Sequence, residues 1–370
     1  MAEKFLLKNI FNKEMVSFIG QNIKDVYPDF KLDSFIDEVM LGFDLLSFSE
    51  RAEHIASKLH AYLPANYLEA IDIIEKSLGP VIEEEELEGF DCFYVMPLGV
   101  YVKNYGLHEY DRSMHALKEM TMRFTSEWPI RVFIETDEKR ALYFFGIWAQ
   151  DENCHVRRLV SEGTRPRLPL GTRLKKYVKD PSTVLNLLES LKNERTRLVQ
   201  RSIANSLNDI AKDHPLRVTG FLSRWKEEKV NDIDWIISHA CRSLIKEGDV
   251  EAMKLMGYKT DVKIKRLELE LDKGEISLGD NLEFRLCFEL EEKSDLIIDY
   301  LLYFKKANGS LKAKVFKIKS KSFSKGKVEI TKKHPLKEAT TRQYYEGIHA
   351  IALQINGKVY APQKEFLLKL

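Results

Sequence analysis

The 370-residue chain is 44% hydrophobic and 31% charged, which is typical of a soluble globular protein and excludes a fibrous or wholly disordered chain. Its net charge of +1 hides an uneven distribution: the net charge is −11 over residues 1–150, +6 over 151–260 and +6 over 261–370. A basic latter half favours a surface that binds a polyanion, because lysine and arginine exchange condensed counterions for protein contacts. Random variation in charge is the alternative explanation.

The chain shows no sign of a membrane or secretion segment. It has no run of about twenty consecutive apolar residues, and its first residues, MAEKFLLKNIFNKEM, carry charges where a signal peptide needs an apolar core. We therefore expect a cytoplasmic protein without membrane contacts. The four cysteines are widely spaced and form no CxxC pair, so the sequence predicts neither a zinc site nor a disulfide framework. The acidic run 83–86 is expected to be a solvated loop or the start of a helix.

Two hydrophobic patterns divide the chain near residues 257–263. Up to residue 258, apolar residues mostly return to one face of a helix, as in the set Phe35, Ile36, Val39, Met40, Phe43 and Leu46. From Asp261 onward apolar and polar residues alternate, as in strands. Three turn-forming pairs predict hairpins in this part: Asn308-Gly309, Lys325-Gly326 and Asn356-Gly357. We therefore predict a mainly α domain over residues 1–258, followed by a small all-β sandwich over residues 263–370.

The helical part contains an internal repeat. Three segments align with offsets of 43 and 37 residues, which is close to the length of HEAT-like helix pairs: RLVSE at 158–162, RSIAN at 201–205 and SHACR at 238–242. A fourth segment, RFTSE at 123–127, precedes the first by 35 residues. The repeat predicts an α-solenoid of HEAT-like repeats, in which the second helix of each pair lines the concave face.

Equivalent positions in such repeats form a ladder along one surface. Glu127, Glu162, Asn205 and Arg242 occupy one ladder position. Asp209 follows Asn205 by one helical turn and lies on the same face. We therefore predict that the carboxylates of Glu127, Glu162 and Asp209 face one groove.

Three segments around these carboxylates closely resemble the signature blocks of AlkC-type DNA glycosylases. They are FTSEWPIR at 124–131, HVRRLVSEGTRPRLPL at 155–170 and NSLNDIAKDHP at 205–215. The resemblance implies excision of small cationic lesions, chiefly N3-methyladenine, without full base flipping. One subgroup of the family carries a C-terminal immunoglobulin-like domain, so the resemblance also implies such a domain here, in agreement with the β pattern.

The chemistry that the resemblance implies suits these residue types. Methylation at N3 makes adenine a cation and a good leaving group, so the reaction needs no general acid, no metal and no cofactor. Cleavage of the glycosidic bond places positive charge on the deoxyribose, and carboxylates aimed at C1′ can stabilise this charge and orient the attacking water. By resemblance, the catalytic residues are Glu127, Glu162 and Asp209; which of them holds the water stays open.

Each of these carboxylates has a structural alternative. Glu127 could pair with Arg131 one turn later. Glu162 could be an exposed charge at the end of its helix. Asp209 could pair with Lys212 in its own helix.

The basic residues of the same region are candidates for phosphate contacts, since the guanidinium fork suits bidentate binding of a phosphate. These candidates are Arg157, Arg158, Arg165, Arg167, Arg201, Lys212 and Arg242. Arg157 could equally pair with an acidic residue of its own or a neighbouring repeat. Trp128 could offer its indole face to a cationic base, or it could belong to the core.

The β part carries five lysines at roughly alternating positions: Lys312, Lys314, Lys317, Lys319 and Lys321. The alternation slips at Val315-Phe316, and a bulge there would place all five lysines on one face. Such a face could hold a DNA backbone, or it could protect a sheet edge against aggregation.

Together these observations predict a DNA alkylation repair glycosylase that acts as a monomer on double-stranded DNA containing alkylated bases. It would hydrolyse the N-glycosidic bond of the cationic base and leave an abasic site. Two alternatives stay open: a non-catalytic HEAT-repeat scaffold, and a protein that binds damaged DNA without cleaving it. The carboxylates placed among arginines favour the enzyme, because a scaffold does not need them.

Overall fold

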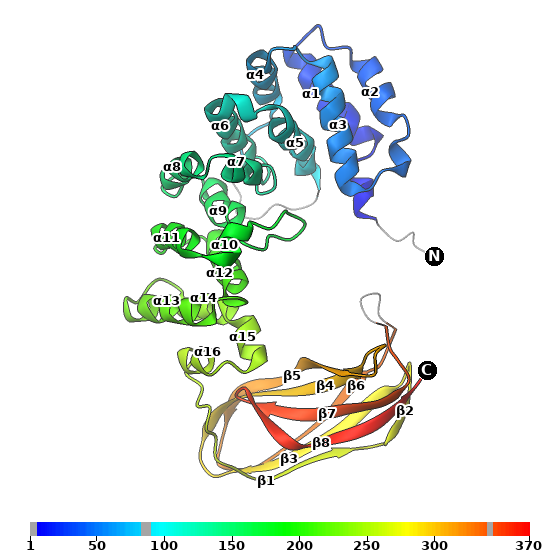
Figure 1. Ribbon diagram of the computed structural model, residues 1–370, viewed down its shortest axis with the longest axis vertical. Helices are drawn as coiled ribbons and strands as arrows, with labels where there is room; N and C mark the ends of the chain where they lie inside the picture. The colour runs from blue at the N-terminus through cyan, green and yellow to red at the C-terminus, as the bar shows by residue number, and fades with distance from the viewer. Residues whose placement is uncertain (1–5, 83–89, 339–342) are drawn as a thin grey trace. The chain divides into compact units, whose positions relative to one another are not determined.

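The structure, a computed structural model, describes residues 6–82, 90–338 and 343–370. The acidic run 83–86 lies outside the described residues. Helices form the first two thirds of the chain and strands form the rest (Figure 1). Within the described ranges, no helix is long and apolar enough to cross a membrane.

The α-helices are α1 (Lys13–Val26), α2 (Leu32–Met40), α3 (Phe48–Tyr62), α4 (Tyr67–Ser77), α5 (Val95–Tyr105), α6 (Tyr110–Thr121), α7 (Ile130–Thr136), α8 (Glu138–Trp148), α9 (Cys154–Gly163), α10 (Lys175–Lys179), α11 (Ser182–Ser190), α12 (Arg197–Ala211), α13 (Pro215–Glu227), α14 (Ile233–Ala240), α15 (Arg242–Glu247) and α16 (Val250–Leu255). Short 3-10 turns occur at Leu7–Ile10, Phe43–Leu45, Asp91–Tyr94 and Leu107–Glu109. The periodic set that begins at Phe35 does not form one helix, because α2 ends at Met40 and Gly42 adopts a left-handed conformation with φ of 72°.

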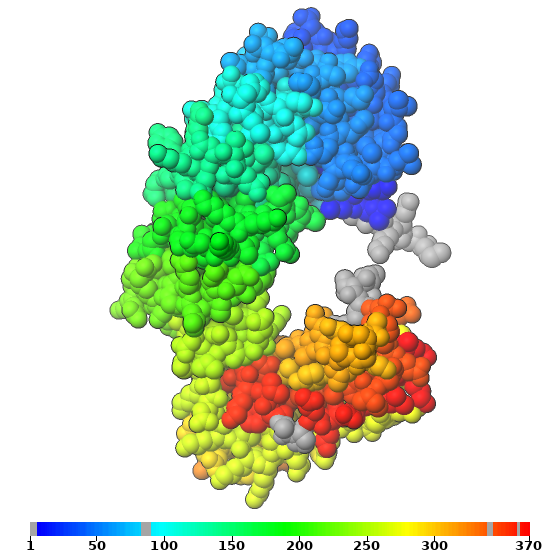
Figure 2. Space-filling model, in the orientation of Figure 1, coloured from blue at the N-terminus to red at the C-terminus, as the bar shows by residue number. Residues whose placement is uncertain are grey.

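The middle of the chain forms the predicted HEAT-like helix pairs. Helix α9 packs against α12, and α12 packs against α14, so these helices form one row; α8 and α11, which also contact each other, belong to a second row (Figure 1). The space-filling view shows these helices packed against one another without a break (Figure 2). Ile203 and Leu207 of α12 are almost fully buried within this stack. The mainly α solenoid is therefore confirmed.

The repeat alignment is correct for two segments and inexact for the other two. Segments 158–162 and 201–205 lie in α9 and α12, two stacked helices. Segment 238–242 crosses from the end of α14 into α15. Segment 123–127 is not helical, because it lies in the turn between α6, which ends at Thr121, and α7, which begins at Ile130. Glu127 and Arg242 therefore do not occupy a helical ladder position equivalent to Glu162.

The strands form a two-sheet, immunoglobulin-like sandwich. They are β1 (Ile264–Leu271), β2 (Glu275–Ser277), β3 (Asn281–Leu290), β4 (Ser294–Lys305), β5 (Leu311–Phe323), β6 (Gly326–Pro335), β7 (Gly347–Ile355) and β8 (Lys358–Lys369). One sheet has the order β1-β3-β6 and the other β2-β8-β7-β4-β5, and every pair is antiparallel except β2 with β8. Alternate residues of both sheets fill the core between them, including Leu282, Phe284, Leu302, Ile351 and Leu368.

Two of the three predicted hairpins are present. Asn308-Gly309 joins β4 to β5, and Asn356-Gly357 joins β7 to β8. Lys325-Gly326 instead connects strands of different sheets, β5 and β6. A turn signal in the sequence shows where the chain reverses, and it does not show whether the next strand stays in the same sheet.

Strand β5 lies at the edge of the five-stranded sheet, and its lysines do not all share one face. The register shifts opposite Ile298 and Asp299 of β4, so the irregularity lies beyond Val315-Phe316. Four lysines lie opposite core-facing residues of β4: Lys312, Lys314, Lys319 and Lys321. Lys317 lies opposite Asp299 and therefore on the other face.

The chain divides into two compact units, residues 1–213 with 227–240 and residues 214–226 with 241–370. Helices α13, α15 and α16 thus belong to the same unit as the sandwich. Gly248 and Gly357 approach closely there, because a Cβ on Gly248 would lie 2.3 Å from the Gly357 carbonyl oxygen. The change from helix to strand falls between Leu255 and Ile264, as the sequence indicates; the division into domains over residues 1–258 and 263–370 stays a prediction.

Asp299 makes the stability of the sandwich dependent on pH. Burial raises the pKa of its carboxyl group to about 6, against the opposing effect of Lys317 and Lys246. A carboxyl group whose pKa is raised by folding stabilises the folded state below its unfolded pKa, and this stability is lost as the pH rises through the folded pKa. Asp299→Asn should therefore raise the free energy of unfolding at pH 7 by about 3 kcal/mol.

Urea denaturation of the wild type and Asp299→Asn at about pH 4 and at pH 7 measures this effect. The exposed Asp295, on the same strand, provides the control variant Asp295→Asn. A gain for Asp299→Asn that is equal at both pH values, or that the control reproduces, would contradict the prediction.

Candidate active site

Three carboxylates and two arginines form one chain of ion pairs in the helical unit. Arg158 Nη2 donates to Glu127 Oε2 at 2.9 Å and lies 3.9 Å from Glu162 Oε1. Arg165 Nη1 donates to Glu162 Oε2 at 2.9 Å, and its Nε donates to Asp209 Oδ2, also at 2.9 Å. The structure thus brings together the three carboxylates that the sequence singles out.

Local structure holds each carboxylate in a different way. Glu162 lies near the end of α9, and Gly163 allows this end to approach α7, since a Cβ there would meet Ile130 Cγ2 at 2.8 Å. Asp209 lies on α12, which stacks against α9. Glu127 lies in the turn before α7, where the Thr125 hydroxyl donates to its Oε2 at 2.8 Å.

The structure decides between the structural alternatives for these residues. Glu127 pairs with Arg158 and not with Arg131. Glu162 is only 4% exposed, so it is not a solvated helix-end charge. Asp209 does accept a hydrogen bond from Lys212 Nζ at 3.0 Å, in addition to the one from Arg165.

The three carboxylates are buried, and the charges of Arg158, Arg165 and Lys212 balance theirs. The side chains of Glu127, Glu162 and Asp209 are 10%, 5% and 4% exposed. Burial acts to lower the pKa of the Arg165 guanidinium, but the charges of Glu162 and Asp209 outweigh it and raise the pKa. Fixed charges in such a poorly solvated place act more strongly on a nearby charge than they would in water.

Arg131 holds the backbone next to this cluster. The sequence suggests Arg131 only as a partner for Glu127. It is 1% exposed, and its guanidinium donates to the carbonyl oxygens of Gly163, Arg165 and Thr172 at 2.8 to 3.0 Å. Burial lowers the pKa of Arg131 to about 10. In the sequence, an arginine within the apolar stretch of α7 indicates a buried cation with a fixed partner.

The other predicted phosphate-binding residues lie in different surroundings. Arg157 forms a bidentate pair with Glu194, at 2.5 and 3.1 Å, and joins the segments before α9 and α12. Arg167 forms a bidentate pair with Asp213, in which Nε donates to Oδ2 at 3.1 Å and Nη2 donates to Oδ1 at 2.9 Å. Arg201 is exposed on α12, and Arg242 begins α15 in the other compact unit.

Trp128 does not belong to the core. Its side chain is half-buried, and its indole N–H donates to the Pro169 carbonyl at 3.3 Å. It borders a cavity of about 340 Å³ that Arg131 and Leu170 also line. Trp128 therefore contacts the segment that follows α9, at the margin of the carboxylate cluster.

We expect Arg131 to be essential for the stability of this region. Arg131→Met would leave three buried carbonyl groups without their donor, so the free energy of unfolding should fall by about 3 kcal/mol. Urea denaturation measures the change. Arg140→Met is the control, because Arg140 is 44% exposed in its ion pair with Asp111 and should cost less than about 1 kcal/mol. If both variants lose similar amounts of unfolding free energy, the buried contacts of Arg131 stabilise the protein no more than an exposed ion pair does.

Comparisons with known proteins agree with this architecture. The model of the family described as "DNA alkylation repair enzyme" matches residues 129–244, a range that contains Glu162 and Asp209 and begins two residues after Glu127. The model described as "Uncharacterised protein YhaZ, C-terminal Ig-like domain" matches residues 265–370.

Two relatives match along nearly the whole chain. Protein YhaZ of Bacillus subtilis (strain 168) is 34% identical over 355 residues, which cover 95% of this chain and 97% of YhaZ. The structure is similar to that of Pseudomonas fluorescens alkylpurine DNA glycosylase AlkC bound to DNA containing an abasic site analog, with a TM-score of 0.88, 35% identity, and coverage of 99% of this chain and 100% of AlkC. The chain therefore belongs to the DNA alkylation repair enzyme family, in the AlkC-like group that carries a C-terminal Ig-like domain.

Proposed function

We propose that this protein hydrolyses the N-glycosidic bond of cationic alkylated bases in duplex DNA, chiefly N3-methyladenine, and leaves an abasic site. The observation that carries the proposal is the cluster of Glu127, Glu162 and Asp209, held together by Arg158 and Arg165. Charged groups are seldom buried unless they are paired, and the pairing here fixes three carboxylates in one place. We further propose that the protein acts as a cytoplasmic monomer.

The proposed reaction uses the carboxylates as fixed electrostatic partners. The methylated base leaves as a neutral molecule, so the protein does not need to protonate it. Positive charge then develops on the deoxyribose, and carboxylates held near C1′ stabilise it without reorganising. One of them also accepts a proton from the attacking water. Arg158 and Arg165 keep the carboxylates apart and aligned, because each guanidinium contacts two of them.

The proposed DNA contacts follow from the exposure of the basic residues. Arg201 is exposed and Lys212 is 45% exposed, so both can reach a phosphate. Arg167 and Arg242 are proposed to contact the backbone as well, since the pair of Arg167 with Asp213 is partly exposed, and Trp128 is proposed to border the lesion. Since Glu194 occupies the guanidinium of Arg157, we propose that Arg157 acts on DNA binding indirectly, by fixing the start of α9. The DNA containing an abasic site analog in the AlkC complex supports DNA as the partner; we propose that this partner is double-stranded and carries alkylated bases.

Release of N3-methyladenine from methylated DNA tests the proposed function. The intact protein should release the free base, and Glu127→Gln, Glu162→Gln or Asp209→Asn should each lower the single-turnover rate by about 100-fold or more. DNA binding should persist in these variants. Glu119→Gln is the control, because Glu119 pairs with Arg123 outside the cluster.

Three other outcomes would contradict parts of this proposal. If the intact protein releases no base where a known glycosylase does, but binds methylated DNA, it is a binding protein only. If it neither releases the base nor binds DNA, the scaffold alternative is correct. Full activity in all three carboxylate variants would place the active site elsewhere.

The lysines of the edge strand β5 are proposed to contribute to DNA binding. Replacing Lys312, Lys314, Lys319 and Lys321 by alanine should weaken DNA binding. The plot of log affinity against log salt concentration should also become less steep, by about one unit of slope for each phosphate contact that is lost. The control is Lys273→Ala with Lys293→Ala, two exposed lysines of loops in the same domain. Titrations at several salt concentrations measure both effects, and an unchanged slope would assign the lysines to the protection of the sheet edge.

A further inference from the structure

The connection between α9 and α10 carries an exposed apolar tip. Leu170 is 83% exposed and lies between Pro169 and Gly171. Its φ of 58° is in the left-handed region, which is unfavourable for a residue with a branched side chain. Figure 1 shows this connection as a loop that extends beyond the helices beside α10. The exposure has no benefit for folding, and the backbone conformation has a cost, so this combination points to a role in binding.

The loop is held firmly on both sides of the tip. Arg131 binds two carbonyl groups before the tip and the Thr172 carbonyl after it. Trp128 binds the Pro169 carbonyl, directly next to the tip. Leu168 is buried beneath the turn, and the Gly171 N–H donates to the Leu168 carbonyl at 3.2 Å. The protein therefore holds Leu170 in place in an unfavourable conformation.

The tip has a fixed relation to the carboxylate cluster. Arg165, five residues before Leu170, bridges Glu162 and Asp209, and Arg131 binds the backbone carbonyl of Arg165. The same buried guanidinium thus positions the bridge between the carboxylates and the base of the apolar tip.

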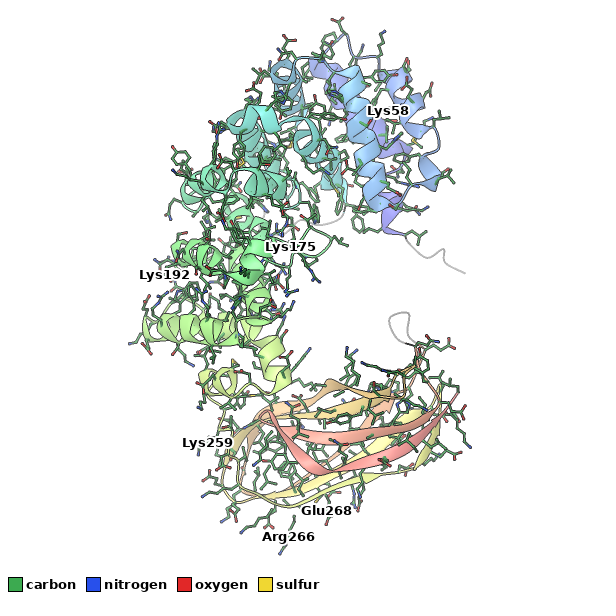
Figure 3. The ribbon with its side chains drawn as sticks, in the orientation of Figure 1. Lys58, Lys175, Lys192, Lys259, Arg266 and Glu268 are labelled. Carbon is green, nitrogen blue, oxygen red and sulfur yellow. The ribbon has the colours of Figure 1, made fainter. Side chains whose placement is uncertain are left out.

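The surroundings of the tip favour a polyanion over another protein. Arg173 and Lys175 follow Leu170 closely, and both are exposed. Lys175, labelled in Figure 3, begins α10 directly after the loop. An apolar side chain beside exposed cations matches the two parts of stacked DNA, since the bases are apolar on their faces and the backbone is anionic.

We propose that Leu170 is a wedge that enters the base stack next to the damaged nucleotide. Leucine is among the side chains that proteins insert between base steps, where they unstack the bases and kink the duplex. Unstacking would expose the damaged nucleotide to the carboxylates, and the damaged base would not have to enter a deep pocket of the protein. This inference rests on the proposed function for its DNA partner, and it adds the residue that separates the bases.

The fluorescence of 2-aminopurine, a base analogue that brightens when it is unstacked, tests the wedge directly. The probe is duplex DNA with a tetrahydrofuran abasic analogue and 2-aminopurine at a neighbouring position, at saturating protein, so that no bond needs to break. The wild type should raise the fluorescence, Leu170→Ala should abolish most of this rise, and Leu170→Met should restore it. Leu45→Ala, which truncates a leucine that is 90% exposed in the same unit, should behave as the wild type does.

The excision rate separates this inference from the proposed function. Leu170→Ala should lower the single-turnover release of N3-methyladenine by about tenfold or more, with unchanged thermal unfolding. A fluorescence rise in Leu170→Ala equal to that of the wild type would overturn the wedge, whether or not the protein releases a base. A rise that depends on Leu170 in a protein that releases no base would support the wedge and refute the glycosylase.

Discussion

The bridge made by Arg165 is the interaction on which the site depends. Glu162 and Asp209 come from different helices, and without a cation between them their like charges would repel in a poorly solvated place. The guanidinium suits this position because its donors form a planar fork that two carboxylates can share. The bridge therefore joins α9 to α12 and fixes the distance between two of the three carboxylates. Arg158 extends the same arrangement to Glu127.

The fold provides this bridge with a rigid support. Helices α9 and α12 stack directly, so Glu162 near the end of α9 lies close to Asp209, one turn beyond the corresponding residue Asn205 of α12. Arg131 then fixes the backbone that carries Arg165, at the cost of burying a second guanidinium nearby. The electrostatic arrangement is thus built before any substrate is bound, which is the condition under which fixed charges lower a reaction barrier most.

The sequence predicts the parts of this site that follow from helical repetition, and it fails where contacts are distant in sequence. The pattern at 158–162 and 201–209 predicts that Glu162 and Asp209 lie close together, and the structure shows them so, because both lie on stacked helices. Glu127 joins the cluster from a turn, so its predicted ladder position is wrong, although it lies close to the other two carboxylates. The pair of Arg157 with Glu194 and the carbonyl contacts of Arg131 span 32 to 41 residues, and no local pattern reveals them. In the sandwich, the alternation predicts strands, but the crossing from β5 to β6 depends on packing between sheets.

We propose that the carboxylates stabilise positive charge on the deoxyribose. The affinity of the protein for DNA that carries a charged sugar analogue tests this role most directly. Two duplexes are compared, one with a cationic pyrrolidine and one with a neutral tetrahydrofuran in place of the damaged nucleotide. We predict that the wild type binds the cationic duplex at least about tenfold more tightly, and that Glu162→Gln loses most of this preference. Equal affinity for both duplexes, or a preference that Glu162→Gln retains, would contradict this role of the carboxylates.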